Sequence, residues 1–112
     1  MDAEGALDLE QAARLLGDAA LVPLVVQAFA ASAPAVLERM REDIVSNDAP
    51  AVRRHLHRLT PTLALLARRD LQDECARISE AWRAPDEAQR QVRSLTLVDR
   101  IAALVRDAAR AS

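Results

Sequence analysis

The sequence predicts an all-α fold, an up-down antiparallel four-helix bundle with a short N-terminal helix that caps one end. Of its 112 residues, 51% are apolar, yet only 2% are aromatic and only two are glycine. This composition favours helices over sheets. Apolar residues recur at steps of three and four along four segments, which are joined by short polar breaks. Such segments bury their apolar stripes most simply as antiparallel neighbours.

The short helix is predicted over Leu9–Leu16. Asp8 can cap its first turn, and Gly17 can end it in a left-handed conformation. A helix of this length contributes little core of its own, so we expect it to cover one end of the bundle.

A long amphipathic helix is expected to follow Asp18, which can serve as its N-cap. Pro34 lies inside this helix, and an interior proline removes one backbone hydrogen bond and bends the axis. We expect one bent helix, with two helices meeting near Ser32 as the alternative. Its predicted core stripe is Val25, Phe29, Ala33, Val36, Met40 and Ile44.

The third helix is expected to start at Asp48, with Pro50 in its first turn. Its apolar residues form the narrow stripe of a bundle helix. They are Val52, Leu56, Leu59, Leu63 and Leu66.

Asp70 is expected to cap the fourth helix, and a loop at residues 84–86 should end it. The fourth stripe comprises Leu71, Cys75, Ile78 and Trp82. On this stripe Cys75 should be a core residue rather than a reactive thiol, and Trp82 should close the base of the core. The last helix is predicted over residues 87–110, with a stripe of Leu95, Val98, Ile101, Leu104, Val105 and Ala108.

Length and charge restrict the class of protein. We expect a single domain over residues 1–112. Fifteen Lys and Arg against seventeen Asp and Glu give a formal charge of −2, which argues against a nucleic-acid partner. The lone Cys75 cannot form an internal disulfide, so a reducing compartment is the default, and no Cys/His cluster has the spacing of zinc ligands.

A membrane partner is not expected. The most apolar stretch, residues 19–37, is interrupted by Pro23, Gln27, Ser32 and Pro34, so it lacks the unbroken run of about 20 residues that a span needs. The first eight residues are acidic and small, unlike a signal peptide. We therefore expect a cytoplasmic protein, and a monomer because the apolar stripes are used internally.

The two histidines of the third helix differ in their predicted surroundings. At about 100° per residue, His57 lies roughly 140° from the centre of the apolar stripe and should face water. His55 lies about 60° from that centre, at the edge of the core. Arg53, Arg54 and Thr60 neighbour His57 one turn away. An exposed imidazole beside guanidinium groups can attack a phosphoryl group, although an exposed histidine can equally be an ordinary surface residue.

The run Leu56-His57-Arg58-Leu59-Thr60-Pro61-Thr62 resembles the signature of histidine-containing phosphotransfer (HPt) domains, in which an exposed His is followed by x, Leu, Lys, Gly and a small residue. The resemblance extends over residues 9–82. It includes Leu15-Leu16-Gly17-Asp18, Phe29 with Ser32-Ala33-Pro34, Asn47-Asp48, and the stripe from Leu71 through Cys75 and Ile78 to Glu80.

This resemblance implies a phosphorelay intermediate of two-component signalling. His57 would accept a phosphoryl group from an aspartate of one receiver domain and donate it to another. The chain would bind no ATP, would have no autokinase activity, and would not be an enzyme in its own right. Its partners would be a response-regulator receiver domain, a hybrid sensor kinase, or both. The receiver would supply the Mg²⁺, so neither a metal nor a cofactor is expected in this chain.

Two departures from the signature affect the chemistry. Thr60 replaces the lysine, so the cation beside the phosphoryl group is missing, and Arg53 or Arg54 are candidates to substitute for it. Pro61 replaces the glycine. It lacks the N–H that would bond the carbonyl of His57, at a cost of about 3 kcal/mol in an ordinary helix interior. Its ring also narrows access to the imidazole, where the family has bare backbone.

These departures leave two alternatives open. One is a degenerate module that docks on a receiver or kinase as a regulator without transferring phosphate, and the other is an unrelated helical bundle. If the family analogy holds, the docking surface is the exposed side of the His57 helix with the adjacent face of the long helix. Its expected contact residues are Arg58 and Arg68, since basic groups suit an acidic receiver face, and Ala64 as the hydrophobic part of the patch.

Overall fold

A computed structural model describes residues 5–84 and 89–111. Within these ranges the chain is helical apart from its connections and one isolated bridge, which confirms the all-α prediction. The elements are α1 (Leu9–Leu16), a 3-10 turn η2 (Ala19–Leu21), α2 (Val22–Val45), α3 (Ala49–Leu66), α4 (Arg69–Ala81) and α5 (Arg90–Ala111).

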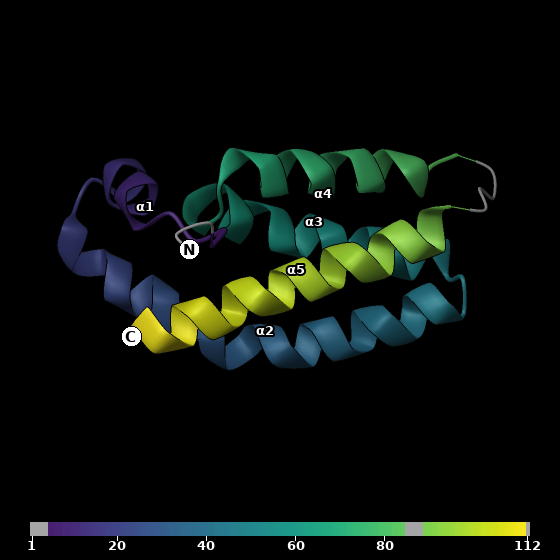
Figure 1. Cartoon of the computed structure of the whole chain (residues 1–112), viewed down its shortest axis with the longest axis horizontal. Coiled ribbons are helices and arrows are strands. Elements are labelled where there is room, and N and C mark those ends of the chain that lie inside the picture. Colours follow the sequence, from purple (N-terminus) through teal and green to yellow (C-terminus); the bar gives the residue numbers. More distant parts are fainter. Residues whose placement is uncertain (1–4, 85–88, 112) are drawn as a thin grey trace.

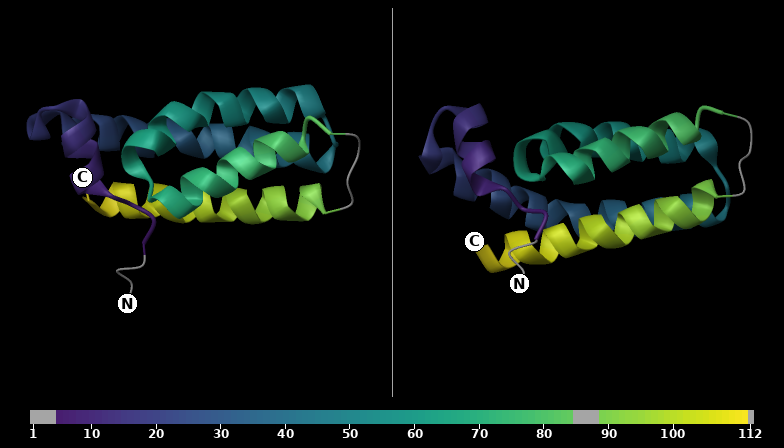
Figure 2. Two further views of the ribbon diagram at one scale, coloured as in Figure 1. Left: turned by 90° about the horizontal axis from the view of Figure 1, so that it is seen from above. Right: turned by 45° about the horizontal axis from the view of Figure 1, so that its top comes forward.

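The four long helices lie side by side, and each runs back along the one before it (Figures 1 and 2). The helix α2 packs against α3, α3 against α4, α4 against α5, and α5 against α2, so the four enclose one core. The short α1 lies across the end of the bundle where α3 finishes (Figure 1).

The predicted stripes of α3 and α4 are buried at every position. The prediction for α2 was partly wrong, because Val25 and Val36 are only half-buried. This helix packs against both α3 and α5, so it needs a wider buried face than a single line of residues. That face comprises Val22, Val26, Phe29, Ala33, Leu37, Met40 and Ile44.

Two of the predicted N-caps, Asp8 and Asp48, are confirmed, whereas Asp18 caps the 3-10 turn η2 and the N-cap position of α2 is held by Leu21. The carboxylate of Asp8 accepts a hydrogen bond from the backbone N–H of Gln11, that of Asp18 from Ala20, and that of Asp48 from Ala51. These bonds satisfy donors that the first turn of a helix leaves without partners.

The predicted N-cap of α4 was wrong. The helix begins two residues earlier, Arg68 occupies the N-cap, and Asp70 lies in the first turn. The backbone explains the difference, because the Arg68 N–H donates to the carbonyl of Ala6 at 2.7 Å and the Arg68 carbonyl accepts from Leu71 and Gln72. In the first turn the Asp70 carboxylate still suits the positive end of the helix.

The end of α3 is covered by α1, as predicted. The side-chain amide of Gln11 donates to the carbonyls of Ala64, Leu65 and Ala67 at 2.9–3.1 Å. Just before α1, Leu7 pairs with Ala67 in an antiparallel bridge. One glutamine therefore satisfies carbonyls that the end of α3 would otherwise leave open.

The base of the core is closed by Trp82, also as predicted, since the indole is 1% exposed. The indole N–H donates to the hydroxyl of Ser94 at 2.7 Å. The guanidinium of Arg90 lies over the ring, 4.2 Å from its centroid, and donates to the carbonyl of Ala84 and to the amide oxygen of Asn47. Arg90 and Ser94 are buried polar residues that periodicity did not predict.

Both interior prolines lie within continuous helices. Pro34 lies in α2 and Pro61 in α3, and both side chains are exposed. The prediction of one helix across Pro34 is confirmed, since α2 is continuous from Val22 to Val45 and the ring of Pro34 is exposed.

One stretch of the described residues, Ala19–Val45, is long and apolar enough to cross a membrane, with a mean hydropathy of 1.9 over its span-length window. By length and hydropathy, the argument that the prolines and polar residues of this stretch exclude a membrane span was therefore wrong. Those residues are few and uncharged, so they lower the mean hydropathy only a little. A core helix of a soluble protein passes the same test. In this structure α2 buries one face against α3 and α5.

Candidate functional site

His57 is exposed on the outer side of α3, as predicted. Its neighbours on the inner side, Leu56 and Leu59, are 0% and 5% exposed, so burial of the stripe turns the imidazole outward. His55 is different, because its side chain is 12% exposed and its Nε2 lies 2.7 Å from a carboxylate oxygen of Asp43 on α2. His55 therefore joins α3 to α2, and His57 is the histidine that a partner can reach.

Two hollows adjoin the His57 ring. The larger is an open hollow of about 550 Å³ and the smaller is one of about 260 Å³. Both are lined by Arg53, His57 and Arg83. The larger is also lined by Pro50, Arg54 and Arg58, and the smaller by Thr60, Ala76, Ser79 and Glu80. The imidazole thus lies at the seam between α3 and α4, among four guanidinium groups.

Arg53 has a structural contact as well as a place beside His57. Its guanidinium donates to the backbone carbonyl of Trp82 at 2.9 Å, and the side chain is half-buried. This bond satisfies a carbonyl at the C-terminal end of α4 and ties that end to α3. Arg54, in contrast, is exposed and lines the larger hollow.

Thr60 does not replace a cation. Its hydroxyl donates to the carbonyl of Leu56, one turn back in α3, at 2.7 Å, and its side chain is also hydrogen-bonded to Cys75. Pro61 is exposed but lines neither hollow. The two departures from the signature therefore leave the face of α3 just beyond His57 without a positive charge.

A model described as the Hpt domain matches residues 24–111, a range that contains His57 and α3, α4 and α5 in full. The chain belongs to the Hpt domain family. Hpt domains are the histidine phosphotransfer modules of two-component phosphorelays, and they interact with receiver domains and kinases. No curated protein and no solved structure matches the chain.

Sequence reasoning missed one residue beside the histidine of this Hpt domain, Arg83. It follows α4, and its guanidinium forms an ion pair of 3.6 Å with the carboxylate of Glu80. Nothing in the sequence indicated this position beyond a basic residue directly after Trp82. The fold brings it to His57 because α4 runs back along α3.

The residues expected to dock a partner do not all lie together in the Hpt domain. Arg58 is exposed and lines the larger hollow with His57. Ala64 is half-buried, two turns further along α3. Arg68 is exposed after the end of α3, beside α1, and the nine helical steps from His57 to Leu66 alone correspond to about 14 Å along α3.

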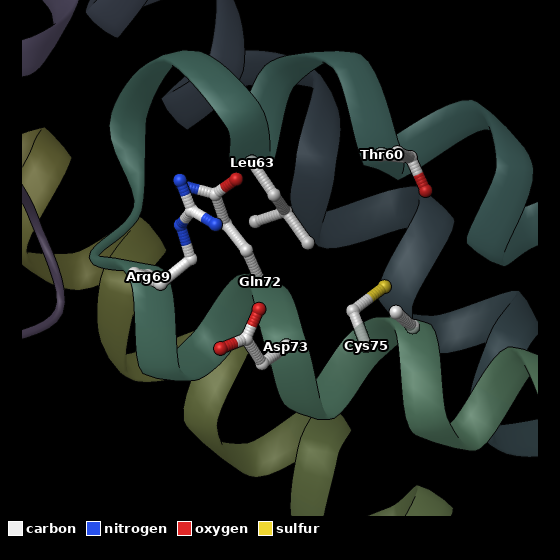
Figure 3. Close-up of a pocket in the computed structure, with 7 residues that line it drawn as sticks. Thr60, Leu63, Arg69, Gln72, Asp73 and Cys75 are labelled. Atoms are coloured by element: carbon white, nitrogen blue, oxygen red, sulfur yellow. The ribbon is translucent and has the colours of Figure 1, made fainter.

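A third cavity, of about 260 Å³, lies between α3 and α4 (Figure 3). Its lining includes Thr60, Leu63, Gln72 and Cys75, and the sulfur of Cys75 points toward the Thr60 side of the cavity. Cys75 is 3% exposed, which confirms it as a core residue. Burial raises the pKa of the Cys75 thiol above its ordinary value of 9.0, and the hydrogen bond with Thr60 opposes part of that rise.

This environment predicts an inert thiol. Iodoacetamide at pH 8 should alkylate Cys75 at least about tenfold more slowly in the native protein than in urea, as followed by intact mass, because the reactive species is the thiolate. The raised pKa also means that the unfolded chain loses this proton first. Ionisation of Cys75 should therefore cause no pH dependence of the free energy of unfolding below pH 9, and it should lower that free energy as the pH rises further. Equal alkylation rates in the two states would contradict the burial of this side chain.

Proposed function

We propose that this Hpt domain is a phosphorelay intermediate in which His57 accepts a phosphoryl group from the aspartyl phosphate of one receiver domain and donates it to an aspartate of another. The observation that carries this proposal is the exposed imidazole beside a hollow lined by four arginines. A neutral imidazole nitrogen is a nucleophile, and guanidinium groups offset the charge of a phosphate that approaches it.

The transfer requires little chemistry from the chain itself. The lone pair of an imidazole nitrogen attacks phosphorus, a P–N bond forms, and the P–O bond to the aspartate breaks with its electron pair, so that a carboxylate leaves. Donation to the next receiver reverses these steps. Such transfers depend mainly on alignment and on stabilisation of charge, and His57 on a packed helix supplies a fixed nucleophile. The Mg²⁺ belongs to the receiver in this proposal, and the Hpt domain contributes neither ATP binding nor autokinase activity.

The remaining parts of the proposal concern architecture and partners. We infer an up-down antiparallel four-helix bundle with α1 as its cap, a single domain over residues 1–112, and a cytoplasmic monomer. The partner is a response-regulator receiver domain, a hybrid sensor kinase, or both. Arg58 and Arg68 contact it in this proposal, since exposed basic residues complement an acidic surface, and Ala64 provides the hydrophobic part of the contact.

A second candidate function is a degenerate Hpt module that docks on a receiver or kinase without phosphotransfer. It is favoured by the contacts of Thr60, whose hydroxyl is engaged by Leu56 and Cys75, and by the proline ring at Pro61. Neither residue offers a charge to a phosphoryl group.

Phosphoramidate separates the two candidates, because it phosphorylates histidine without a protein partner. Its P–N bond breaks as the imidazole attacks, and ammonia leaves. Intact mass should show one acid-labile phosphoryl adduct on the native protein and on His55→Gln, but none on His57→Gln. Absence of the adduct on folded wild-type protein would favour the degenerate module. An adduct that persists on His57→Gln would overturn the assignment of the site.

A further inference from the structure

The larger hollow beside His57 is strongly cationic. Four guanidinium groups line it, and none of its described lining residues is acidic. A phosphorylated imidazole would place two negative charges here, and arginine is suited to this ligand because its planar fork can donate two hydrogen bonds to phosphate oxygens. The question is which of the four guanidinium groups faces the phosphoryl group.

Three of the four are less well placed than Arg83. Arg53 is half-buried and donates to the Trp82 carbonyl. Arg54 and Arg58 lie on α3 itself, about 60° and 100° around the helix axis from His57. Both line the larger hollow but not the smaller one. Arg83 reaches the site from the turn after α4 and lines both hollows together with His57. It therefore flanks the imidazole on the side that faces α4.

We propose that Arg83 supplies the cation that faces the phosphoryl group on His57, in place of the lysine that the family carries three residues after the histidine. This inference rests on the proposed function. The phosphoryl group then lies over the seam between α3 and α4 rather than over α3 alone, and the partner's aspartate approaches along that seam.

The fold fixes the backbone of Arg83 and leaves its side chain able to move. Its N–H donates to the carbonyl of Glu80 at 3.0 Å, and the preceding residue, Trp82, is held by Arg53 and Ser94. The side chain itself is 67% exposed. The guanidinium thus starts from a fixed point near His57 and can turn toward a new charge.

Glu80 competes for the same guanidinium. Its carboxylate lines the smaller hollow and lies 3.6 Å from Arg83, with a side chain that is 74% exposed. Exposed ion pairs of this kind are weak, whereas a phosphoryl group offers more charge and better geometry. Phosphorylation would therefore draw Arg83 from Glu80 to the phosphoryl oxygens. Removing the charge of Arg83 should slow phosphorylation of His57, and removing the charge of Glu80 should speed it.

The first measurement compares rates of phosphorylation by phosphoramidate in four proteins. Relative to wild type, Arg83→Gln should be labelled about fivefold more slowly, and Glu80→Gln about twofold faster. Arg39→Gln, which removes an exposed arginine of α2, should match wild type. The lifetime of the phosphohistidine at neutral pH should follow the same order. If Arg83→Gln and Arg39→Gln are labelled alike, Arg83 does not have this role, while the relay itself remains supported.

The second measurement does not depend on phosphotransfer. Inorganic phosphate should shift the ring-proton resonances of His57 in NMR spectra of the unmodified protein, with at least about threefold weaker binding in Arg83→Gln. If wild-type protein takes up no phosphoryl group but shows this Arg83-dependent shift, the proposed relay fails and the anion site stands. If phosphate shifts His57 equally in both proteins, the role of Arg83 fails.

Discussion

Replacing Trp82 by alanine is expected to lower the free energy of unfolding by about 3–5 kcal/mol, as for other buried aromatic side chains. The indole is fully buried at the base of the core, where it is among the largest buried side chains. Its loss leaves a cavity that the surrounding helix ends fill only in part. It also removes the ring over which the buried guanidinium of Arg90 lies.

Urea unfolding followed by circular dichroism measures this loss. Trp82→Phe is the matched control, because it keeps an aromatic ring for packing and for Arg90 but removes the N–H that bonds Ser94. That variant should lose only about 1–2 kcal/mol. A loss below 1 kcal/mol in Trp82→Ala would show that the base of the core does not depend on this side chain.

Replacing Pro61 by alanine is expected to raise the free energy of unfolding by about 2 kcal/mol. The helix α3 continues for five residues beyond Pro61, so proline occupies an interior position, where it is about 3 kcal/mol less favourable than alanine. Alanine restores an N–H that can donate to the carbonyl of His57. Because Pro61 is exposed, the substitution loses no core packing.

Thermal unfolding measures this gain, which should raise Tm by about 4 °C for each kcal/mol in a domain of this size. Pro50→Ala is the matched control. Pro50 lies in the first turn of α3, where a missing N–H breaks no helical bond, so its replacement should change Tm little. A similar gain from both variants, or a lower Tm for Pro61→Ala, would contradict this explanation.

The core of α3 and α4 could be predicted from sequence because each helix buries one narrow side, which sequence spacing records directly. The wider face of α2 could not be predicted in the same way. Val26 and Leu37 are buried there in preference to Val25 and Val36. Which residues of α2 are buried depends on where α3 and α5 each pack against it. The start of α4 was misplaced because Arg68 is held by the backbone of Ala6, a contact that local sequence does not encode.

The outward position of His57 followed from the same periodicity that buries its neighbours. The presence of Arg53 and Arg54 beside His57 followed from it as well, whereas the position of Arg83 depends on how α4 lies against α3. Spacing along α3 indicated Arg53 and Arg54 as the cations beside His57, whereas the structure bonds Arg53 to the end of α4 and adds Arg83 from the turn that follows it.

The segment before α2 matters for anyone who isolates this domain. A fragment trimmed to residues 24–111, the range that the family model matches, would keep every helix that carries or adjoins His57. It would lose Gln11, which satisfies three carbonyls at the end of α3, and the bridge of Leu7 to Ala67. The apolar ends of α2 and α3 would then face water at one end of the fragment. The shortest piece suited to biophysical work therefore begins before Ala6, well outside the range that the family model matches.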